Sequence, residues 1–280
     1  MDEQDREAII WDDPREGPRG GWTVLRRQCH PLPVEPFANI LVDCGEILKP
    51  DATKICRQSG GILLDNVQED QARRVAEGLS RNGEECLLVP AARIVDAPRA
   101  LPIHSVHLTA TDMGPTDAMG KRRSAPWDRC LAMAMANVEA PEKSSGPGGA
   151  RGRGLRKGLA GPTTGEVLSA VLGDGPRSPW TGGDAVVRTT VDIVFDEPMT
   201  RYRIDARGFD YGVLADRRQH YSKQNIQILA RWLLHAAPHI QTSFSSEALM
   251  QMGEVEVPAM ARRMFDEVVK WLVNVARLGL

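Results

Sequence analysis

Long apolar runs are missing from this chain, and their absence limits where the protein acts. No stretch approaches the ~18–20 consecutive apolar residues that span a bilayer. The N-terminus, Met1 to Arg6, is charged where a secretory signal would turn apolar. We therefore expect a cytoplasmic protein with no membrane partner.

Cysteine is scarce and scattered. The five cysteines of the chain include no CxxC pair, which argues against a disulfide framework. The nearest approach to a metal signature is Cys29-His30 with Cys44 and Cys56 downstream, but structural zinc sites usually carry ligand pairs two to four residues apart. We expect no metal site here.

Recognisable catalytic signatures are missing as well. The sequence contains no phosphate loop, GxSxG or HExxH pattern. His104 and His107 would point to opposite faces of a strand, and Pro238 interrupts the helix between His235 and His239. We therefore predict neither catalytic residues nor a cofactor.

Neither sign of charge dominates, because 35 basic residues nearly balance 37 acidic ones and the net charge is −2. A global field that attracts nucleic acid or anionic lipid is excluded. One local departure lies in the glycine-rich segment 141–185, which is predicted to be a flexible loop or linker. Its basic residues are a candidate contact for an anionic partner: Arg151, Arg153, Arg156 and Lys157.

The 280 residues exceed the usual single-domain size of roughly 100–200 residues, so two folded modules are expected. Residues 1–35 contain several prolines and glycines and are predicted to be an N-terminal arm. Trp11 and Trp22 are large apolar side chains within it. The arm either docks these tryptophans on the body of the protein or presents them to a partner.

Residues 36–98 predict a small α/β module. The run from Phe37 to Leu48 fits both a strand and a helix, and its β-branched residues and Gly45 favour the strand. A short helix from Pro50 to Cys56, a strand from Gly61 to Val67, a helix over 68–81 and a strand over 85–89 follow. This order is β-α-β-α-β, a ferredoxin-like module.

The stretch from Lys54 to Val89 resembles the C-terminal domain of the ribosomal stalk protein. The resemblance rests on "EDQARRVAEGLSRNGEECLLV", a helix followed by Asn82-Gly83 and a strand. It implies a small α/β fold and a protein-binding role, and it implies nothing about an active site.

Residues 99–280 predict a second α+β module that contains the flexible loop. A strand is expected over 103–109, whereas 127–138 fits either a helix or a strand. Val186 to Phe195 and Tyr202 to Tyr211 predict an antiparallel hairpin. Amphipathic helices are predicted over 222–237 and 258–277, and Gln227 is expected to lie away from the apolar stripe of the first. The element order of 103–240 resembles a bacterial pleckstrin-homology-type fold.

The hairpin carries a cluster of opposite charges. Its acidic residues are Asp192, Asp196, Glu197, Asp205 and Asp210, and its basic residues are Arg201, Arg203 and Arg207. Cross-strand ion pairing on the solvent face explains this pattern most simply. A carboxylate site for hydrolysis or phosphodiester cleavage is the alternative.

The leading functional hypothesis is a non-catalytic, cytoplasmic binding or adaptor protein. It combines two mixed α/β modules of the α+β class, no cofactor and a protein partner. Two alternatives stay open: a hydrolase or phosphodiesterase that uses the hairpin carboxylates, and a nucleic-acid-binding protein that uses the basic loop. The composition leaves the oligomeric state undetermined.

Overall fold

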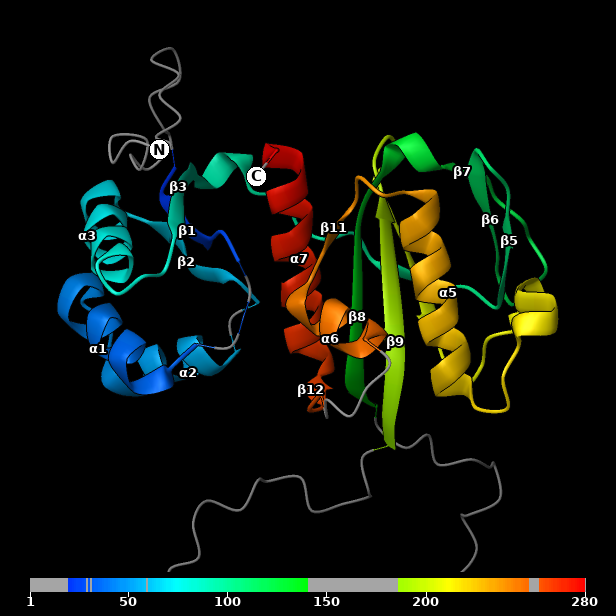
Figure 1. Cartoon of the computed structure of the whole chain (residues 1–280). Helices are drawn as coiled ribbons and strands as arrows, with labels where there is room; N and C mark the ends of the chain where they lie inside the picture. Colours follow the sequence, from blue (N-terminus) through cyan, green and yellow to red (C-terminus); the bar gives the residue numbers. More distant parts are fainter. Residues whose placement is uncertain are drawn as a thin grey trace, which may run out of the picture. The chain divides into compact units, whose positions relative to one another are not determined.

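The structure, a computed structural model, describes residues 20–28, 30, 32–58, 60–140, 186–251 and 257–279. It confirms the mixed α+β class (Figure 1). In chain order the elements are β1 (Trp22–Arg26), α1 (Val34–Gly45), α2 (Lys49–Gln58), β2 (Ile62–Val67), α3 (Glu69–Ser80), β3 (Cys86–Pro90), η2 (Ala91–Arg93), β4 (Ala100–Pro102), β5 (Ser105–Leu108), β6 (Asp112–Thr116), β7 (Ala125–Pro126), η3 (Trp127–Arg129), β8 (Cys130–Ala140), β9 (Val186–Phe195), β10 (Thr200–Asp205), η4 (Tyr211–Arg217), α5 (Ser222–Ala236), β11 (Gln241–Thr242), α6 (Phe244–Met250), β12 (Met260–Ala261) and α7 (Arg262–Leu278).

The N-terminal sheet has the strand order β2-β1-β3, and β1 is antiparallel to both neighbours. The helix α3 connects β2 to β3 across β1, which is the split β-α-β arrangement. The prediction of an irregular arm over 1–35 is wrong for Trp22–Arg26, because these residues form the central strand. Trp22 is buried, as expected for a docked tryptophan, whereas Trp11 lies outside the described residues.

The strand predicted from Phe37 to Leu48 is wrong, because Val34–Gly45 forms the helix α1. Phe37, Ala38 and Leu41 are buried on one side of it, while Asn39 and Asp43 are exposed. A spacing of three to four residues therefore outweighs the β-branched content. The predicted β-α-β-α-β order for 37–90 becomes α-α-β-α-β, preceded by β1.

The helix α3 confirms the prediction over 68–81. Ala72, Val75, Ala76 and Leu79 are all buried and pack with Trp22 in the core of the N-terminal module. Helices α1 and α3 approach closely at Gly78, where an added Cβ would lie 2.7 Å from Cγ2 of Ile40. The strands predicted over Gly61–Val67 and 85–89 are also confirmed, as β2 and β3.

The larger sheet has the strand order β11-β8-β9-β10-β4, and β12 also pairs with β8. The predicted hairpin is confirmed, since β9 and β10 are antiparallel. Its second strand ends at Asp205 instead of continuing to Tyr211. The loop predicted over 141–185 lies outside the described residues.

The ambiguous stretch 127–138 forms the strand β8 after a short 3-10 turn. Small and large side chains alternate along it, with Ala132, Ala134 and Ala136 on one face of the sheet. Met133 and Met135 lie on the other face, in the core beneath α5. This alternation has the period of two that a strand requires.

The helix α5 confirms the prediction over 222–237 and buries Ile226, Leu229 and Leu233 against the larger sheet. Gln227 was expected to lie away from the core, and this is wrong. Its side chain is 9% exposed and its Nε2 donates a hydrogen bond to the carbonyl of Leu249, 2.7 Å away. The polar edge of α5 therefore holds the end of α6.

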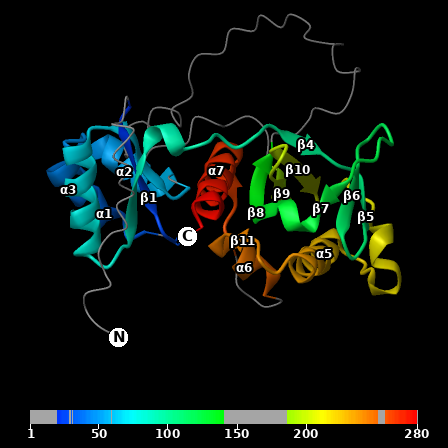
Figure 2. The same cartoon turned by 90° about the horizontal axis from the view of Figure 1, so that it is seen from above.

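The C-terminal helix α7 packs between the two sheets (Figures 1 and 2). Phe265, Val269 and Leu272 share one core with β8 alanines of the larger sheet and with side chains of the N-terminal sheet, namely Leu25, Leu87 and Val89. Trp271 Nε1 donates a hydrogen bond of 2.7 Å to the Arg26 carbonyl. One helix thus joins the two predicted modules. Within the part of the chain that is described, no helix is long and apolar enough to cross a membrane.

Candidate functional site

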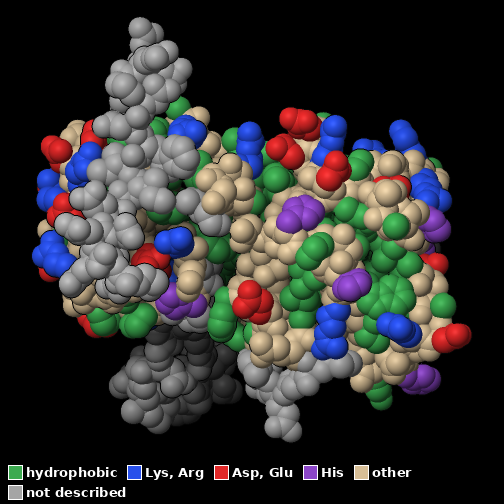
Figure 3. Space-filling model, turned by 45° about the horizontal axis from the view of Figure 1, so that its top comes forward, with side chains coloured by type: hydrophobic (Ala, Val, Ile, Leu, Met, Phe, Trp, Pro, Cys, Tyr) green, Lys and Arg blue, Asp and Glu red, His purple; other side chains and the backbone are tan. Residues whose placement is uncertain are grey.

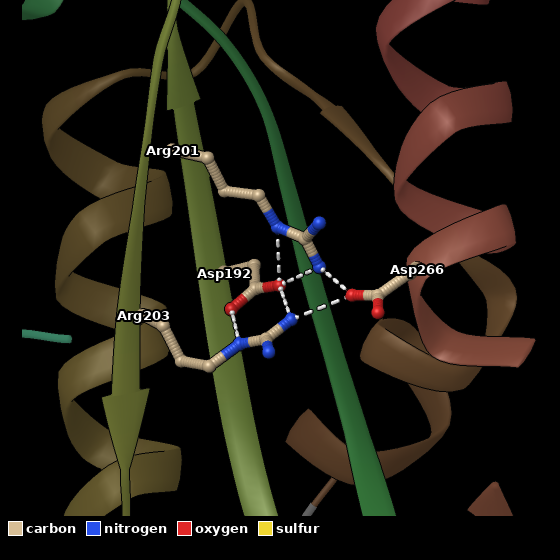
Figure 4. Close-up of polar contacts among 4 residues, drawn as sticks. All are labelled: Asp192, Arg201, Arg203 and Asp266. Atoms are coloured by element: carbon tan, nitrogen blue, oxygen red, sulfur yellow. Dashed lines mark hydrogen bonds and ion pairs between the residues drawn. The ribbon is translucent and has the colours of Figure 1, made fainter. Parts of the chain in front are cut away.

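The charged residues of the hairpin meet on the face of the larger sheet that α7 covers (Figure 4). Asp192 of β9 lies directly opposite Arg203 of β10, and Arg201 lies two residues before Arg203 on the same face. Asp266 reaches the group from α7. We call these four residues the Asp192 network. Three of them come from the β9–β10 hairpin, and the fourth comes from α7, far along the chain.

Asp192 is fully buried and is held by both guanidinium groups. Arg203 Nε donates to Asp192 Oδ1 over 2.7 Å, and Arg203 Nη2 donates to Oδ2 over 2.6 Å. Arg201 Nε donates to Oδ2 over 2.7 Å, and its Nη2 contacts the same oxygen. The two arginines also share Asp266 Oδ1, at 2.6 Å and 2.9 Å.

The pKa shifts favour the charged forms of this network. Burial alone would raise the pKa of Asp266, but hydrogen bonds from Arg203 and the charge of Arg201 outweigh burial and lower that pKa. Burial alone would lower the pKa of Arg203, but its bonds to Asp192 and Asp266 raise that pKa overall. The neighbouring Arg262 has a lowered pKa because of burial and the charge of Arg203.

The other hairpin acids do not converge with Asp192. Asp205 Oδ2 accepts a hydrogen bond from Arg188 Nη1 over 3.0 Å, while Glu197 lies in the turn, 3.9 Å from Arg129. Cross-strand ion pairing is therefore confirmed. The expected solvent-facing position is wrong for Asp192, whose carboxylate is buried beneath α7. Its four contacts suit a structural tie rather than a base open to a substrate.

A polar hollow of about 480 Å³ adjoins this network. Arg201, Arg203 and Asp266 form one wall, and Lys270 forms another. Lys270 Nζ lies 2.8 Å from Asp96 and 3.7 Å from Asp65, so its charge is matched from two sides. The charges of Arg201, Arg203, Asp266 and Lys270 in this hollow are thus paired with neighbouring charged groups.

A second cavity, about 470 Å³ in volume, has a different character. We call it the apolar groove. Both modules contribute to its walls, and the apolar side chains that define it are Leu32, Val34, Phe244, Val257, Met260 and Met264. Phe244, the first residue of α6, is 52% exposed although it is a large aromatic side chain. The groove therefore offers solvent-accessible apolar surface within a concave site.

One end of the apolar groove is polar. Arg26 is 2% exposed, and its Nε donates a hydrogen bond of 2.6 Å to Glu84 Oε1, which is itself buried. His30 Nε2 lies 3.4 Å from Glu84 Oε2. Arg26, His30 and Arg57 line the groove, and none of the described lining residues is acidic. Because Arg26 is bonded to Glu84, the exposed Arg57 is the cationic group that this end presents.

Of the residues that line this groove, His30 and Cys56 stood out in the sequence, as part of a metal pattern that was not expected to bind zinc, and Arg26 did not. Arg26 ends the apolar run "WTVLR" and pairs with Glu84 across 58 positions, so its partner has no local signal. The "SFSS" segment at the start of α6 was a detectable signal, because Ser243 caps the helix and leaves Phe244 at its exposed start.

The remaining candidates separate into two groups. Arg151, Arg153, Arg156 and Lys157 lie outside the described residues, so the basic loop stays a prediction. Among the residues that are described, no cluster of three or more His, Cys, Asp or Glu side chains is arranged to hold a metal ion. On the face drawn in Figure 3, basic and acidic side chains are interspersed.

Comparisons with models of known protein families, with curated proteins and with solved structures gave no match. The resemblances to the stalk domain and to the pleckstrin-homology-type fold therefore rest on the sequence alone. The apolar groove and the Asp192 network are the features of the described residues that bear on function.

Proposed function

We propose that this chain is a non-catalytic cytoplasmic binding protein that acts through protein–protein contacts, and that the apolar groove receives a segment of its partner. The observation that carries the proposal is the groove itself. It is concave, mostly apolar and ends in a few polar groups, as ligand sites usually do.

The chemistry of the groove indicates what the partner segment carries. Phe244 is an exposed aromatic side chain, the type that often dominates the binding energy of an interface. Met260 and Met264 have flexible, polarisable side chains that adapt to different apolar groups. Arg57 and His30 add cationic or donor groups at the polar end. The groove therefore suits an apolar peptide segment that has an acidic residue beside it.

The test is affinity capture from native lysate with three forms of the full chain, followed by mass spectrometry. The forms are the unaltered chain, Phe244→Asp and Tyr221→Asp. Tyr221 is the matched control, because it is an aromatic residue, 67% exposed, that does not line the groove. We expect a partner that the unaltered and Tyr221→Asp chains retain and the Phe244→Asp chain loses.

A hot-spot residue contributes about 2 kcal/mol or more, and each 1.4 kcal/mol is about tenfold in affinity. The identified partner should therefore bind Phe244→Asp at least about 25-fold more weakly in a direct titration. Equal retention by all three forms would contradict the proposal. Recovery of nucleic acid in place of protein, with affinity that falls steeply as salt rises, would favour the basic loop instead.

A further inference from the structure

We infer that the N-terminal segment of this same chain, residues 1–13, occupies the apolar groove and competes with the partner. The inference rests on the proposed function, because it names an internal regulator of the same site. Three observations support it: the charge of the segment, its apolar residues and the position at which it joins the fold.

Charge is the first observation. Residues 1–13 read "MDEQDREAIIWDD" and contain six acidic residues but only one basic residue, Arg6. The described lining of the groove has no acidic side chain and includes the exposed Arg57, whereas the charge of Arg26 is already paired with the buried Glu84. Opposite charges at the rim favour this segment and direct its approach.

The apolar content of the segment is the second observation. Ile9, Ile10 and Trp11 are adjacent, and Asp12 and Asp13 follow them directly. This is the combination of apolar and acidic groups that the groove suits. The volume of about 470 Å³ lies within the roughly 300–1,000 Å³ typical of ligand sites.

Reach is the third observation. Gly20, the first described residue, lies two residues before β1 begins at Trp22, and Arg26, at the far end of this strand, lines the groove. From Gly20 to Arg26 the chain advances six residues, which measures roughly 20 Å at about 3.3–3.4 Å per residue. From Trp11 to Gly20 the chain can extend to roughly 30 Å. Pro14, Gly17 and Pro18 are residues that favour a reversal of direction. Trp11 can therefore return to the groove.

A tethered segment competes at an effective concentration in the millimolar range when its linker is short and flexible. A free partner must bind the groove strongly enough to displace this tethered segment. Removal of the apolar groups of the segment should therefore strengthen partner binding, whereas alteration of the groove should weaken it.

The direct test is photocross-linking in the full chain, with p-benzoylphenylalanine in place of Trp11. We expect an intrachain cross-link to peptides that contain Phe244 or Met264, with a yield that does not change on tenfold dilution. Phe244→Asp should lower the yield several-fold, and Tyr221→Asp should leave it unchanged. Ile9→Ser with Ile10→Ser, which alters the segment and not the groove, should lower it as well.

A cross-link elsewhere on the chain, no cross-link, or an interchain product that disappears on dilution would each overturn the inference. The proposed function fails separately. A partner whose capture depends on Phe244, together with no groove cross-link, would support the proposed function and reject internal competition. A groove cross-link without any captured partner would support the docked segment and count against the proposed function.

Discussion

Asp192→Asn is the most informative single substitution for the fold, because it keeps the size of the side chain and removes its charge. The two guanidinium groups that now surround a fully buried carboxylate would face a neutral amide, and Arg201 is itself only 3% exposed. Breaking a buried pair by removing one partner costs about 3–5 kcal/mol. This is a large part of the roughly 5–15 kcal/mol that stabilises a typical domain.

Thermal unfolding followed by circular dichroism measures the effect. Each 1 kcal/mol shifts the midpoint by roughly 2–4 °C in a domain of about 150–250 residues, so a decrease of roughly 6–20 °C is expected. Asp216→Asn is the control, because Asp216 is exposed and surface changes usually stay within about ±0.5 kcal/mol. A midpoint equal to that of the control would show that the Asp192 network contributes nothing to stability.

A combined variant separates charge from packing. Asp192→Leu with Arg201→Met and Arg203→Met replaces the buried ions by apolar side chains, and such replacements are often neutral or stabilising. Asp266 stays 44% exposed and keeps its access to water. The triple variant should therefore melt at a higher temperature than Asp192→Asn. The opposite order would mean that shape, and not an unpaired charge, causes the loss.

Three further predictions follow from the same structure. Burial raises the pKa of both Cys86 and Cys130 to about 12, so iodoacetamide at pH 8 should label the partly exposed Cys44 well before either of them, as peptide mapping can check. The pKa of Asp266 is lowered in the folded state. Its contribution to folding stability is therefore fully present above the ordinary carboxyl pKa of about 3.9 and is lost as the pH falls through the lowered pKa of the folded state. Urea titrations should show a larger difference in stability between the unaltered chain and Asp266→Asn at pH 7 than at pH 3. Ala134→Leu should cost about 1–3 kcal/mol in the free energy of unfolding by urea, because Ala134 is 1% exposed against α7.

Patterns that repeat within one element were predictable from the sequence. The spacing of Ala72, Val75 and Leu79 predicted α3, and the alternation in 186–195 predicted β9. The run from Phe37 to Leu48 fitted both the period of a helix and that of a strand. The choice between them depended on which of its side chains are buried by the rest of the chain. That choice is fixed by β1 and α3, which lie elsewhere in the chain.

The sites were less predictable, because they join distant parts of the chain. The Asp192 and Arg203 pair could be inferred from the hairpin register, but Asp266 reaches it from a helix 63 positions beyond Arg203. The apolar groove depends on how α6 and α7 meet the N-terminal module. No local pattern of residues records that arrangement.

The position of α7 has a consequence for the order of synthesis. The strands β1, β2 and β3 are complete once Pro90 is made, yet Leu25, Leu87 and Val89 await a helix that ends at Leu278. At roughly 5–20 residues per second, the ribosome needs about 10–40 s to supply it. During this interval the nascent N-terminal sheet has no α7 to cover one of its apolar faces, and both sheets can close on this helix only after it has been made.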